Sequence, residues 1–303
     1  MNTRFVEAFL CVVRLGSFRA AAQKLHVSQA AISSRISALE QELGARLFDR
    51  DARDLRLTPV GLRLLSYGER MLELQREMIA IGQGDAKLLG PVRIGAVETV
   101  VHTWLVDFIH ELQSSYPSIE VQLSCESTER LHRSLRDGEI DIALQTDAVV
   151  GDGIVNTHCL PMSLRWVGPP ATYRHGTEPL PSLLEGSVVT LTAGSQPHIA
   201  LKELYRQARL PFGRVHCVGS IAAIVRLVRN GFANALMPPA AVRDDIEAGL
   251  LRIIPCDVSL PNQRFVISYR DNQAAEAISI VAALACGAAD SFSQSLSPPY
   301  APD

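Results

Sequence analysis

The chain has 303 residues, of which 47% are hydrophobic, and its formal net charge is −3. It is longer than the roughly 100–200 residues of one domain, and its near-neutral charge excludes a protein that binds polyanions through overall composition. The charge is uneven, because residues 1–58 hold nine Lys and Arg against six Asp and Glu, and the remainder holds 20 against 26. A basic end beside an acidic body predicts a localised nucleic-acid surface.

The spacing of the cysteines and the composition of the N-terminus exclude further classes of protein. The six cysteines are widely separated and form no CxxC or CxxH pattern, which predicts neither a zinc site nor a disulfide framework. The N-terminus runs directly into an amphipathic helix without a signal-peptide core, and no uninterrupted apolar run of 18 residues occurs. We therefore expect a cytoplasmic, soluble protein with no membrane partner.

Two helices are predicted at the start of the chain. Residues 3–14 place Phe5, Phe9, Val12 and Val13 on one inward face. The segment 18–25 is short and rich in Ala, which lets a neighbouring helix cross it at close range. A tight turn at 26–27 follows.

The third predicted helix ends at Leu43. Its two ends, its apolar face and its polar face can all be recognised in the sequence. Ser28 stands at the N-cap position and Gly44 follows the last apolar residue. One face is an apolar stripe, made of Ile32, Ile36, Leu39 and Leu43. The opposite face is short, polar and uncharged, with Gln29, Ala30, Ser33, Ser34 and Ser37. This arrangement predicts a helix-turn-helix whose second helix enters the major groove, where Gln pairs with adenine and Ser serves either base edge.

A two-stranded wing is predicted over 45–57, where apolar residues alternate around a charged turn. Arg50, Arg53 and Arg56 lie on or near it and are expected to reach phosphates or a narrow minor groove. The alternative is a solvated loop in which Arg53 pairs with Asp51 or Asp54.

Residues 1–60 resemble the DNA-binding end of the LysR-type transcriptional regulators. The matching residues are Gly16-Ser17-Phe18, Ala20-Ala21, Leu25, Val27-Ser28-Gln29, Ala31-Ile32-Ser33, Ile36, Leu39-Glu40, Leu43-Gly44, Leu47-Phe48, Arg50, Leu57-Thr58-Pro59 and Gly61. The resemblance implies a winged helix-turn-helix at 1–58, with double-stranded operator DNA and RNA polymerase as partners. It implies DNA contacts by Ser28, Gln29, Ala30, Ser33, Ser34, Arg35, Arg50 and Arg53. Ala30 stands where the family often has Ser and is expected to touch a thymine methyl, and many members carry Arg at the position of Ser34.

A long helix is predicted over 59–89, beginning at Pro59. Its apolar residues recur at steps of three and four, which is typical of a helix that pairs with a second helix: Leu64, Tyr67, Met71, Leu74 and Met78. The alternative is a helix that lies on its own domain. The resemblance implies dimerisation through this linker, giving a homodimer or homotetramer.

Residues 92–290 alternate between predicted strands and helices, which predicts mostly parallel sheets covered by helices and an α/β class overall. The strands are expected at 92–96, 119–123, 141–144, 187–191, 214–218, 233–237 and 264–269, and the helices at 100–116, 128–137, 200–208, 221–229 and from 274. The tail from Ser291 is expected to be disordered.

This half is similar to the effector domain of the same family, most clearly at 135–143 and 228–238. The resemblance implies a two-lobed, periplasmic-binding-protein-like regulatory domain at 90–303. Lobe one is expected at about 92–162 and 266–303, and lobe two at about 163–265, with two crossing strands as a hinge.

A ligand site is predicted where strands end, because ligands of open parallel sheets bind beyond the carboxyl ends of the strands. The residues expected there are Thr99, Val100, Ser127, Thr128, Thr146, Ser195, Gln196 and His198. Hydroxyls and helix N-termini suit an anion, which favours a small carboxylate or an amino acid-like effector. Glu98 and Asp147 lie at the same edges, so either they point outward or the ligand is neutral or amino-bearing. For each hydroxyl the alternative is a helix cap.

Other function classes find less support in the sequence. His158 and Cys159 are adjacent and face opposite ways on a strand, and no catalytic motif accompanies them, so we expect no enzyme, cofactor or metal. Regulation by cysteine oxidation is the alternative to a small-molecule effector. The sequence therefore predicts a DNA-binding transcriptional regulator that a small molecule controls between two lobes.

Overall fold

The computed structural model describes residues 2–49, 55–82, 91–170, 176–270 and 276–301. The chain forms two compact units, residues 1–90 and residues 91–303. Arg50 and Arg53 lie outside the described residues.

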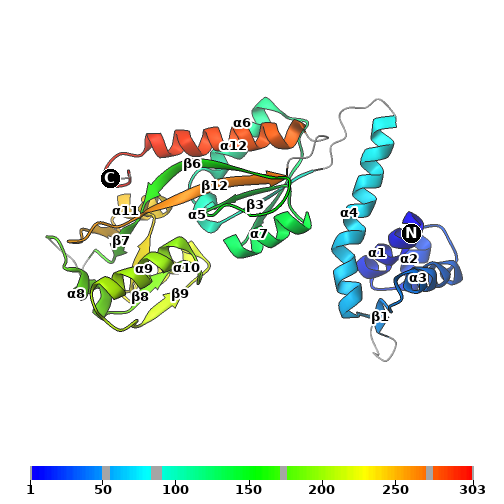
Figure 1. Ribbon diagram of the computed structural model, residues 1–303, viewed down its shortest axis with the longest axis horizontal. Helices are drawn as coiled ribbons and strands as arrows, with labels where there is room; N and C mark the ends of the chain where they lie inside the picture. The colour runs from blue at the N-terminus through cyan, green and yellow to red at the C-terminus, as the bar shows by residue number, and fades with distance from the viewer. Residues whose placement is uncertain (1, 50–54, 83–90, 171–175, 271–275, 302–303) are drawn as a thin grey trace. The chain divides into compact units, whose positions relative to one another are not determined.

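The N-terminal unit is a winged helix-turn-helix (Figure 1). Its helices are α1 (Thr3–Leu15), α2 (Phe18–Lys24) and α3 (Gln29–Leu43), followed by the antiparallel pair β1 (Phe48–Asp49) and β2 (Arg56–Leu57) and by α4 (Pro59–Gly82). The side chains of Asn2, Ser17 and Ser28 each accept a backbone N–H at the start of a helix. Gly16 and Gly44 end α1 and α3 in the left-handed conformation that glycine adopts without strain.

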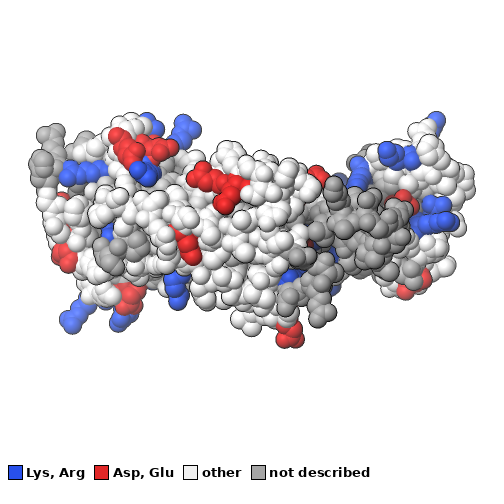
Figure 2. Space-filling model, turned by 90° about the horizontal axis from the view of Figure 1, so that it is seen from above, with Lys and Arg blue, Asp and Glu red and all other residues white. Residues whose placement is uncertain are grey.

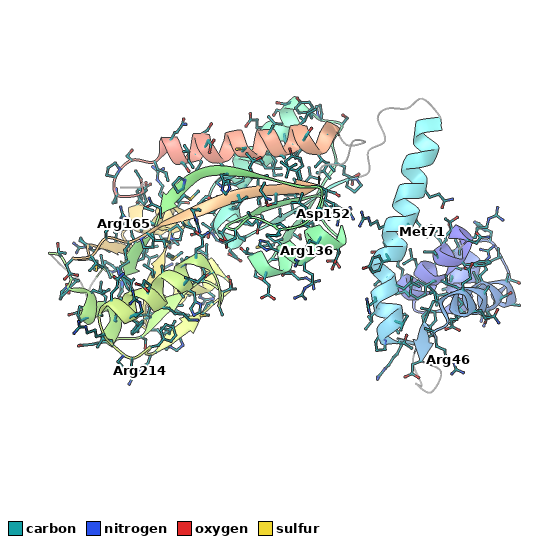
Figure 3. All side chains as sticks on the ribbon, in the orientation of Figure 1. Arg46, Met71, Arg136, Asp152, Arg165 and Arg214 are labelled. Carbon is teal, nitrogen blue, oxygen red and sulfur yellow. The ribbon has the colours of Figure 1, made fainter. Side chains whose placement is uncertain are left out.

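Helix α4 packs partly on its own unit, and its pairing with a second helix stays a prediction. Leu64 and Met71 pack against the core of the N-terminal unit, and Figure 3 shows Met71 on the side of α4 that faces the other helices. Tyr67 is 55% exposed. The apolar residues of α4 lie on two sides of the helix because part of it packs on α1. The two helices come close at Gly68, where a Cβ would lie 3.0 Å from Val6. The side chains of Leu74 and Met78 lie outside the description.

The first sheet of the regulatory unit has the order β4-β3-β5-β12-β6. Its strands are β3 (Val92–Ala96), β4 (Val121–Cys125), β5 (Ile142–Gln145), β6 (Ile154–Ser163) and β12 (Asn262–Arg270). The first three are parallel, and β12 is antiparallel to both β5 and β6. With α5 (Glu98–Val101), α6 (Leu105–Ser115), α7 (Thr128–Asp137) and α12 (Glu276–Ser295), this sheet makes lobe one.

The second sheet has the order β11-β7-β10-β8-β9. Its strands are β7 (Arg165–Gly168), β8 (Val188–Thr190), β9 (Val215–Cys217), β10 (Asn234–Met237) and β11 (Arg252–Ile254). With α8 (Leu180–Glu185), α9 (Gln196–Gln207), α10 (Ile221–Arg229), η1 (Pro239–Val242) and α11 (Arg243–Glu247), it makes lobe two. The α/β class and the two lobes are confirmed.

Two strands connect the lobes. β6 reaches Ser163 and continues through Leu164 into β7, and β12 returns from lobe two beside it (Figure 1). The strand ranges predicted from the sequence did not include β6, β7 or β11, and these strands make both sheets less parallel than expected, because each is antiparallel to its neighbour.

The tail is ordered as far as residue 301, so the prediction of a disordered tail is wrong for the residues described. Helix α12 continues to Ser295, Leu296 is buried, and the Ser163 hydroxyl donates to the carbonyl oxygen of Tyr300 at 2.8 Å. The guanidinium of Arg243 lies 5.6 Å from the Tyr300 ring centre. These contacts supply the burial that the Ser- and Pro-rich composition of the tail did not suggest.

Helix α12 is long and apolar enough to span a membrane by length and composition alone. In this fold its buried residues, among them Val281, Ala285 and Ala289, pack into the core of lobe one. Core helices of soluble domains pass the same test, so the apolar stripe is explained by packing on the sheet.

Candidate nucleic-acid interface and ligand cavity

Helix α3 presents one uncharged face to solvent. The hydroxyl of Ser28 accepts the backbone N–H of Ala31 at 3.1 Å and fixes the first turn. Ile32, Ile36 and Leu39 are buried beneath the helix. The predicted reading residues lie on the other side, where Ser28, Gln29, Ala30, Ser33 and Ser34 are exposed and Arg35 is half-buried. A face of short, uncharged side chains can approach base edges closely.

Basic side chains are exposed on α2 and at the wing. Arg19 and Lys24 on α2 are exposed, and so are Arg46 and Arg56 beside the wing. Figure 2 shows Lys and Arg side chains on the surface of the N-terminal unit, and Figure 3 places Arg46 near the wing. The Thr58 hydroxyl donates to the carbonyl oxygen of Arg46 at 2.6 Å and holds the wing against the start of α4. Exposed basic side chains at these two places suit contacts with phosphate.

A cavity of about 330 Å³ lies between the two lobes of the regulatory unit. Its wall is formed by Val97, Glu98, Thr99, Cys125, Glu126, Ser127, Thr128, Thr146, Leu191, Thr192, Ser195, Gly219 and Gln263. Most of these residues follow the carboxyl ends of β3, β4, β5, β8 and β9, which is where ligands of open sheets bind. The volume suits a small metabolite.

Five of the predicted ligand residues lie on this wall: Thr99, Ser127, Thr128, Thr146 and Ser195. The hydroxyls of Ser127 and Ser195 also accept backbone N–H groups at the starts of α7 and α9, both at 3.4 Å. A hydroxyl that accepts a hydrogen bond retains its own proton. These two caps can therefore still donate to a ligand.

Three predicted ligand residues lie elsewhere. Val100 is fully buried in the core of lobe one, since α5 turns its apolar side inward. His198 is buried on α9, and its Nδ1 accepts the backbone N–H of Gly194 at 2.9 Å. Burial and the nearby Lys202 charge lower the pKa of His198, so the imidazole is held neutral.

Gln196 connects the lobes and does not line the cavity. Its amide nitrogen donates to the carbonyl oxygen of Thr146 at 2.6 Å and to Oδ1 of Asp147 at 3.0 Å. Its amide oxygen accepts the backbone N–H of Arg264 at 2.8 Å. The side chain thus joins α9 of lobe two to the end of β5 and to the crossing strand β12.

The cavity wall is rich in hydrogen-bond acceptors, and the described part of the chain contributes no Lys, Arg or His to it. Glu98 and Glu126 contribute carboxylates, and the amide oxygen of Gln263 is buried without a hydrogen-bond partner in the described part of the chain. Burial raises the pKa of the Cys125 thiol, and the charges of Glu98 and Glu126 raise it further. An anion would meet repulsion here unless it also carried a positive group.

The threonine hydroxyls add to the acceptor character. The Thr146 hydroxyl donates to Oδ2 of Asp147 at 3.1 Å, so the 3.0 Å contact between Thr128 and Thr146 uses the Thr128 proton. Each hydroxyl has one proton, and both are therefore committed. Thr128 retains a free lone pair that can accept from a ligand.

Glu98 has a second role across the cavity. Its Oε2 accepts the backbone N–H of Ile221, the first residue of α10, at 3.1 Å, and lies 3.2 Å from Nε2 of His102. A carboxylate at a helix N-terminus is favourable because the orphan N–H groups there carry partial positive charge. Glu98 of lobe one therefore helps to hold lobe two in place.

The sequence missed several wall residues. Cys125 and Glu126 were passed over because β4 ends two residues later than predicted. Nothing in the sequence pointed to Gln263, which belongs to a crossing strand and reaches the cavity only through the tertiary fold. Gly219, which follows β9, has no side chain that could have indicated a ligand contact.

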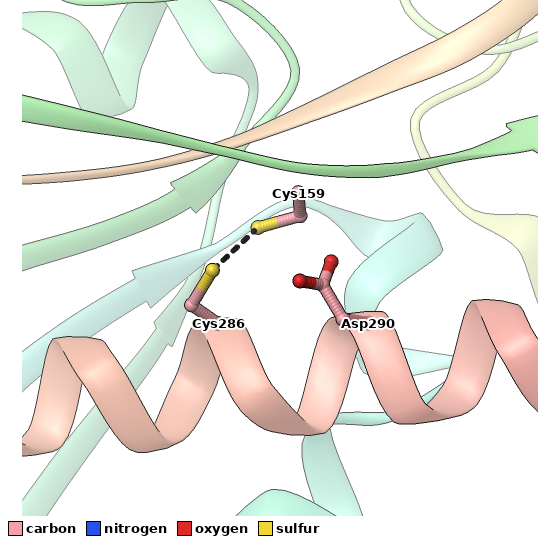
Figure 4. A group of neighbouring side chains, drawn as sticks. All are labelled: Cys159, Cys286 and Asp290. Atoms are coloured by element: carbon pink, nitrogen blue, oxygen red, sulfur yellow. Dashed lines mark hydrogen bonds between the residues drawn. The ribbon is translucent and has the colours of Figure 1, made fainter.

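A pair of cysteines distant in sequence also comes together in lobe one. The sulfurs of Cys159 on β6 and Cys286 on α12 lie 3.8 Å apart, beside Asp290 (Figure 4). Burial raises the pKa of both thiols, and the negative charge of Asp290 adds to this effect. Two thiols that the spacing along the sequence did not connect are thus neighbours in the fold.

Two family models match the chain. "Bacterial regulatory helix-turn-helix protein, lysR family" matches residues 3–62, and "LysR substrate binding domain" matches residues 86–285. The second match spans the cavity and both lobes, and the first spans α1 to α3, the wing and the start of α4.

Known proteins agree with these matches. The chain is 29% identical over 243 residues to the HTH-type transcriptional regulator YofA of Bacillus velezensis, covering 80% of this chain and 83% of that protein. A full-length OxyR variant of Pseudomonas aeruginosa has a similar fold, with a TM-score of 0.70, 22% identity and coverage of 98% and 99%. ArgP of Mycobacterium tuberculosis gives a TM-score of 0.71 at 20% identity, covering 96% and 98%.

Proposed function

The chain belongs to the LysR family of transcriptional regulators, and we propose that α3 reads its DNA site while a small amine-bearing metabolite in the interlobe cavity controls it. The family assignment gives a DNA-binding regulator with an effector-binding domain. The choice of DNA-reading residues and of effector chemistry rests on the surfaces described above.

The DNA contacts follow from the exposed face of α3. Gln29 is placed to pair with adenine, Ser33 and Ser34 to contact either base edge, and Ala30 to touch a thymine methyl. Arg50 and Arg53 complete the proposal as wing residues that contact phosphate. A second copy of the chain, paired through the exposed side of α4 that includes Tyr67, would present two such faces to a two-fold symmetric operator.

The effector is proposed to be amino acid-like, with its amine as the recognised group. One observation carries this choice: among the residues that the structure describes, the cavity presents Glu98, Glu126 and the unpaired amide oxygen of Gln263, and no basic side chain lines it. An ammonium group would satisfy these acceptors. The hydroxyl protons of Ser127 and Ser195, at the starts of α7 and α9, would then receive the carboxylate.

Control of DNA binding is proposed to be a population shift between lobe arrangements. A ligand changes such an equilibrium only if it binds one arrangement better than the other. Glu98 and Gln196 already hydrogen-bond across the lobes, so a ligand at this wall changes the balance of an existing closure. Movement of one lobe would then alter the spacing of the DNA-binding dimers in the oligomer.

Footprinting of full-length protein on its own upstream DNA tests the DNA-reading proposal. Gln29→Ala should reduce discrimination at one base pair by about 1–3 kcal/mol, since a bidentate contact is lost. Gln41→Ala, at the far end of the same exposed helix, is the matched control. Equal discrimination by the two variants would contradict the placement of Gln29 in the groove.

Calorimetry on the full-length protein tests the effector proposal. A panel of L-amino acids is compared with the hydroxy acids and dicarboxylic acids of the same size. We expect heat only from compounds that carry an amine, and we expect Glu126→Gln to weaken their binding at least tenfold. Glu129→Gln, with a side chain 88% exposed on α7, is the matched control. Binding of the dicarboxylic acids, or equal affinity in both variants, would refute the proposal.

A further inference from the structure

We propose that Cys159, Cys286 and Asp290 form a binding site for a thiophilic divalent cation of the Zn²⁺ class. The ligand atoms of these three residues lie within 4.8 Å of one another in lobe one, away from the interlobe cavity. Figure 4 shows both sulfurs and the carboxylate directed into one space between β6 and α12.

The sulfur separation matches a tetrahedral site. Two thiolates bound to one zinc ion at about 2.3 Å, at the tetrahedral angle, are about 3.8 Å apart. The sulfurs of Cys159 and Cys286 are 3.8 Å apart. The two sulfurs therefore need no rearrangement relative to each other, whereas a disulfide would require them to approach to about 2.05 Å.

The carboxylate of Asp290 is oriented toward the same point. Its Oδ1 accepts the backbone N–H of Leu160 at 2.7 Å, which fixes the group and leaves the second oxygen for an ion. Hydrogen bonds of this kind position metal ligands in known sites. Cys286 and Asp290 are four residues apart, so one face of α12 presents both. Cys159 completes the set from β6, the edge strand beneath the helix.

The ligand chemistry selects the class of ion. Two soft sulfurs and one carboxylate oxygen favour Zn²⁺ and related ions over Mg²⁺ and Ca²⁺, which prefer sets made only of oxygen. On binding, each thiol releases its proton to solvent as its sulfur forms a bond to the ion. Since all three residues are only partly buried, a water molecule can take the fourth position.

An ion at this point would fasten α12 to β6 close to the crossing strands. One contact already joins the two elements there, since the Ser293 hydroxyl donates to the carbonyl oxygen of Leu160 at 3.3 Å, and Ser163 at the end of β6 donates to Tyr300 in the segment after α12. The ion would strengthen this junction. Lobe one should therefore be more resistant to unfolding when the ion is bound.

Titration of the reduced full-length protein with Cd²⁺ tests the site, because cadmium bound to thiolates absorbs in the ultraviolet. We expect one equivalent to give the charge-transfer band and Zn²⁺ to displace it. Cys159→Ser and Cys286→Ser should each abolish at least half of the band, and Asp290→Asn should keep it but weaken affinity at least tenfold. Cys217→Ser, which removes an exposed thiol in lobe two, should change neither.

X-ray absorption of the zinc-loaded wild-type protein gives a second readout that needs no variant. Two sulfur scatterers at about 2.3 Å, with oxygen at about 2.0–2.2 Å, are expected. Absence of the cadmium band in reduced, folded wild-type protein would overturn the proposal. An undiminished band in folded Cys159→Ser protein, or a zinc shell without two sulfurs, would overturn it equally.

Discussion

Replacing Gln196 by Ala tests whether the contacts between the lobes control closure. The substitution removes the hydrogen bonds to Thr146 and Asp147 of lobe one and the bond from Arg264 on β12. The backbone of α9 should be unaffected, because Gln196 follows the N-cap and its side chain takes no part in the helix. The change therefore acts on the fit between the lobes.

The magnitude follows from these three bonds. Each hydrogen bond contributes about 0.5–1.5 kcal/mol net, and more where the partner is charged, as at Asp147. The backbone N–H of Arg264 lies at an exposed residue, so water replaces part of its loss. We expect closure to weaken by about 1–3 kcal/mol in total, which corresponds to a change of about 5–150-fold in the equilibrium between closed and open lobes.

Amide hydrogen exchange at Ile221 measures this equilibrium from a distant point. The N–H of Ile221 starts α10 and donates to Glu98 across the lobes, so its protection reports closure without contact to Gln196. We expect its exchange to accelerate about 5–150-fold in Gln196→Ala protein. Gln207→Ala, at the other end of α9, is the control and should leave it unchanged. Faster exchange at Arg264 with no change at Ile221 would refute the reasoning. The loss of the Gln196 hydrogen bonds would then affect only the residues that they join, and not the closure of the lobes.

Two further predictions concern packing and pH. A Cβ at Gly61 would lie only 2.3 Å from the backbone oxygen of Leu47, so Gly61→Ala should destabilise the N-terminal unit by about 1–3 kcal/mol, measured by thermal unfolding. Gly287→Ala is the control, because nothing lies within 4 Å of the added carbon. Burial and Lys202 lower the pKa of His198, so its contribution to stability should be complete above the unfolded value of about 6.5 and be lost as pH falls through the lower folded value. His198→Gln should flatten the dependence of the melting temperature on pH below about 6.5, and an unchanged slope there would contradict this.

The N-terminal unit was predictable because its signals are local. Ser28 and Gly44 mark the ends of α3, and the period of Ile32, Ile36 and Leu39 gives its buried face. A helix cap and an apolar period are properties of one short stretch of chain, so they hold without knowledge of the rest. The same reasoning found α7 and α10 at their observed bounds.

The orientation of α4 was less predictable from its period. Apolar residues at steps of three and four indicate that one side of a helix is buried, but they do not indicate which element buries it. Leu64 and Met71 are covered by their own unit, and Tyr67 is not. Only the packing of α1 against α4, close at Gly68, separates the two cases.

The remaining errors concern residues that long-range pairing brings together. β6 pairs with β12, which lies more than one hundred residues further along the chain, and this pairing places Gln263 at the cavity. Cys159 and Cys286 are 127 residues apart and meet because α12 lies on β6. Rules of ligand spacing along the chain look for neighbours in sequence, so no such rule would have found this cysteine pair.

Glu98 determines the direction in which an effector acts, because its carboxylate serves both the cavity wall and the closure. An amine that takes Oε2 from the N–H of Ile221 would compete with the contact between α5 and α10 and would favour open lobes. An amine bound by Glu126 and Gln263 would leave that contact intact, and the carboxylate of the same ligand at Ser195 would then join lobe one to lobe two, which favours closed lobes. Since a ligand shifts an equilibrium only by its differential affinity, compounds of similar size can have opposite effects on the same cavity. The position of the amine relative to Glu98, more than the strength of binding, should therefore separate an activating ligand from an antagonist.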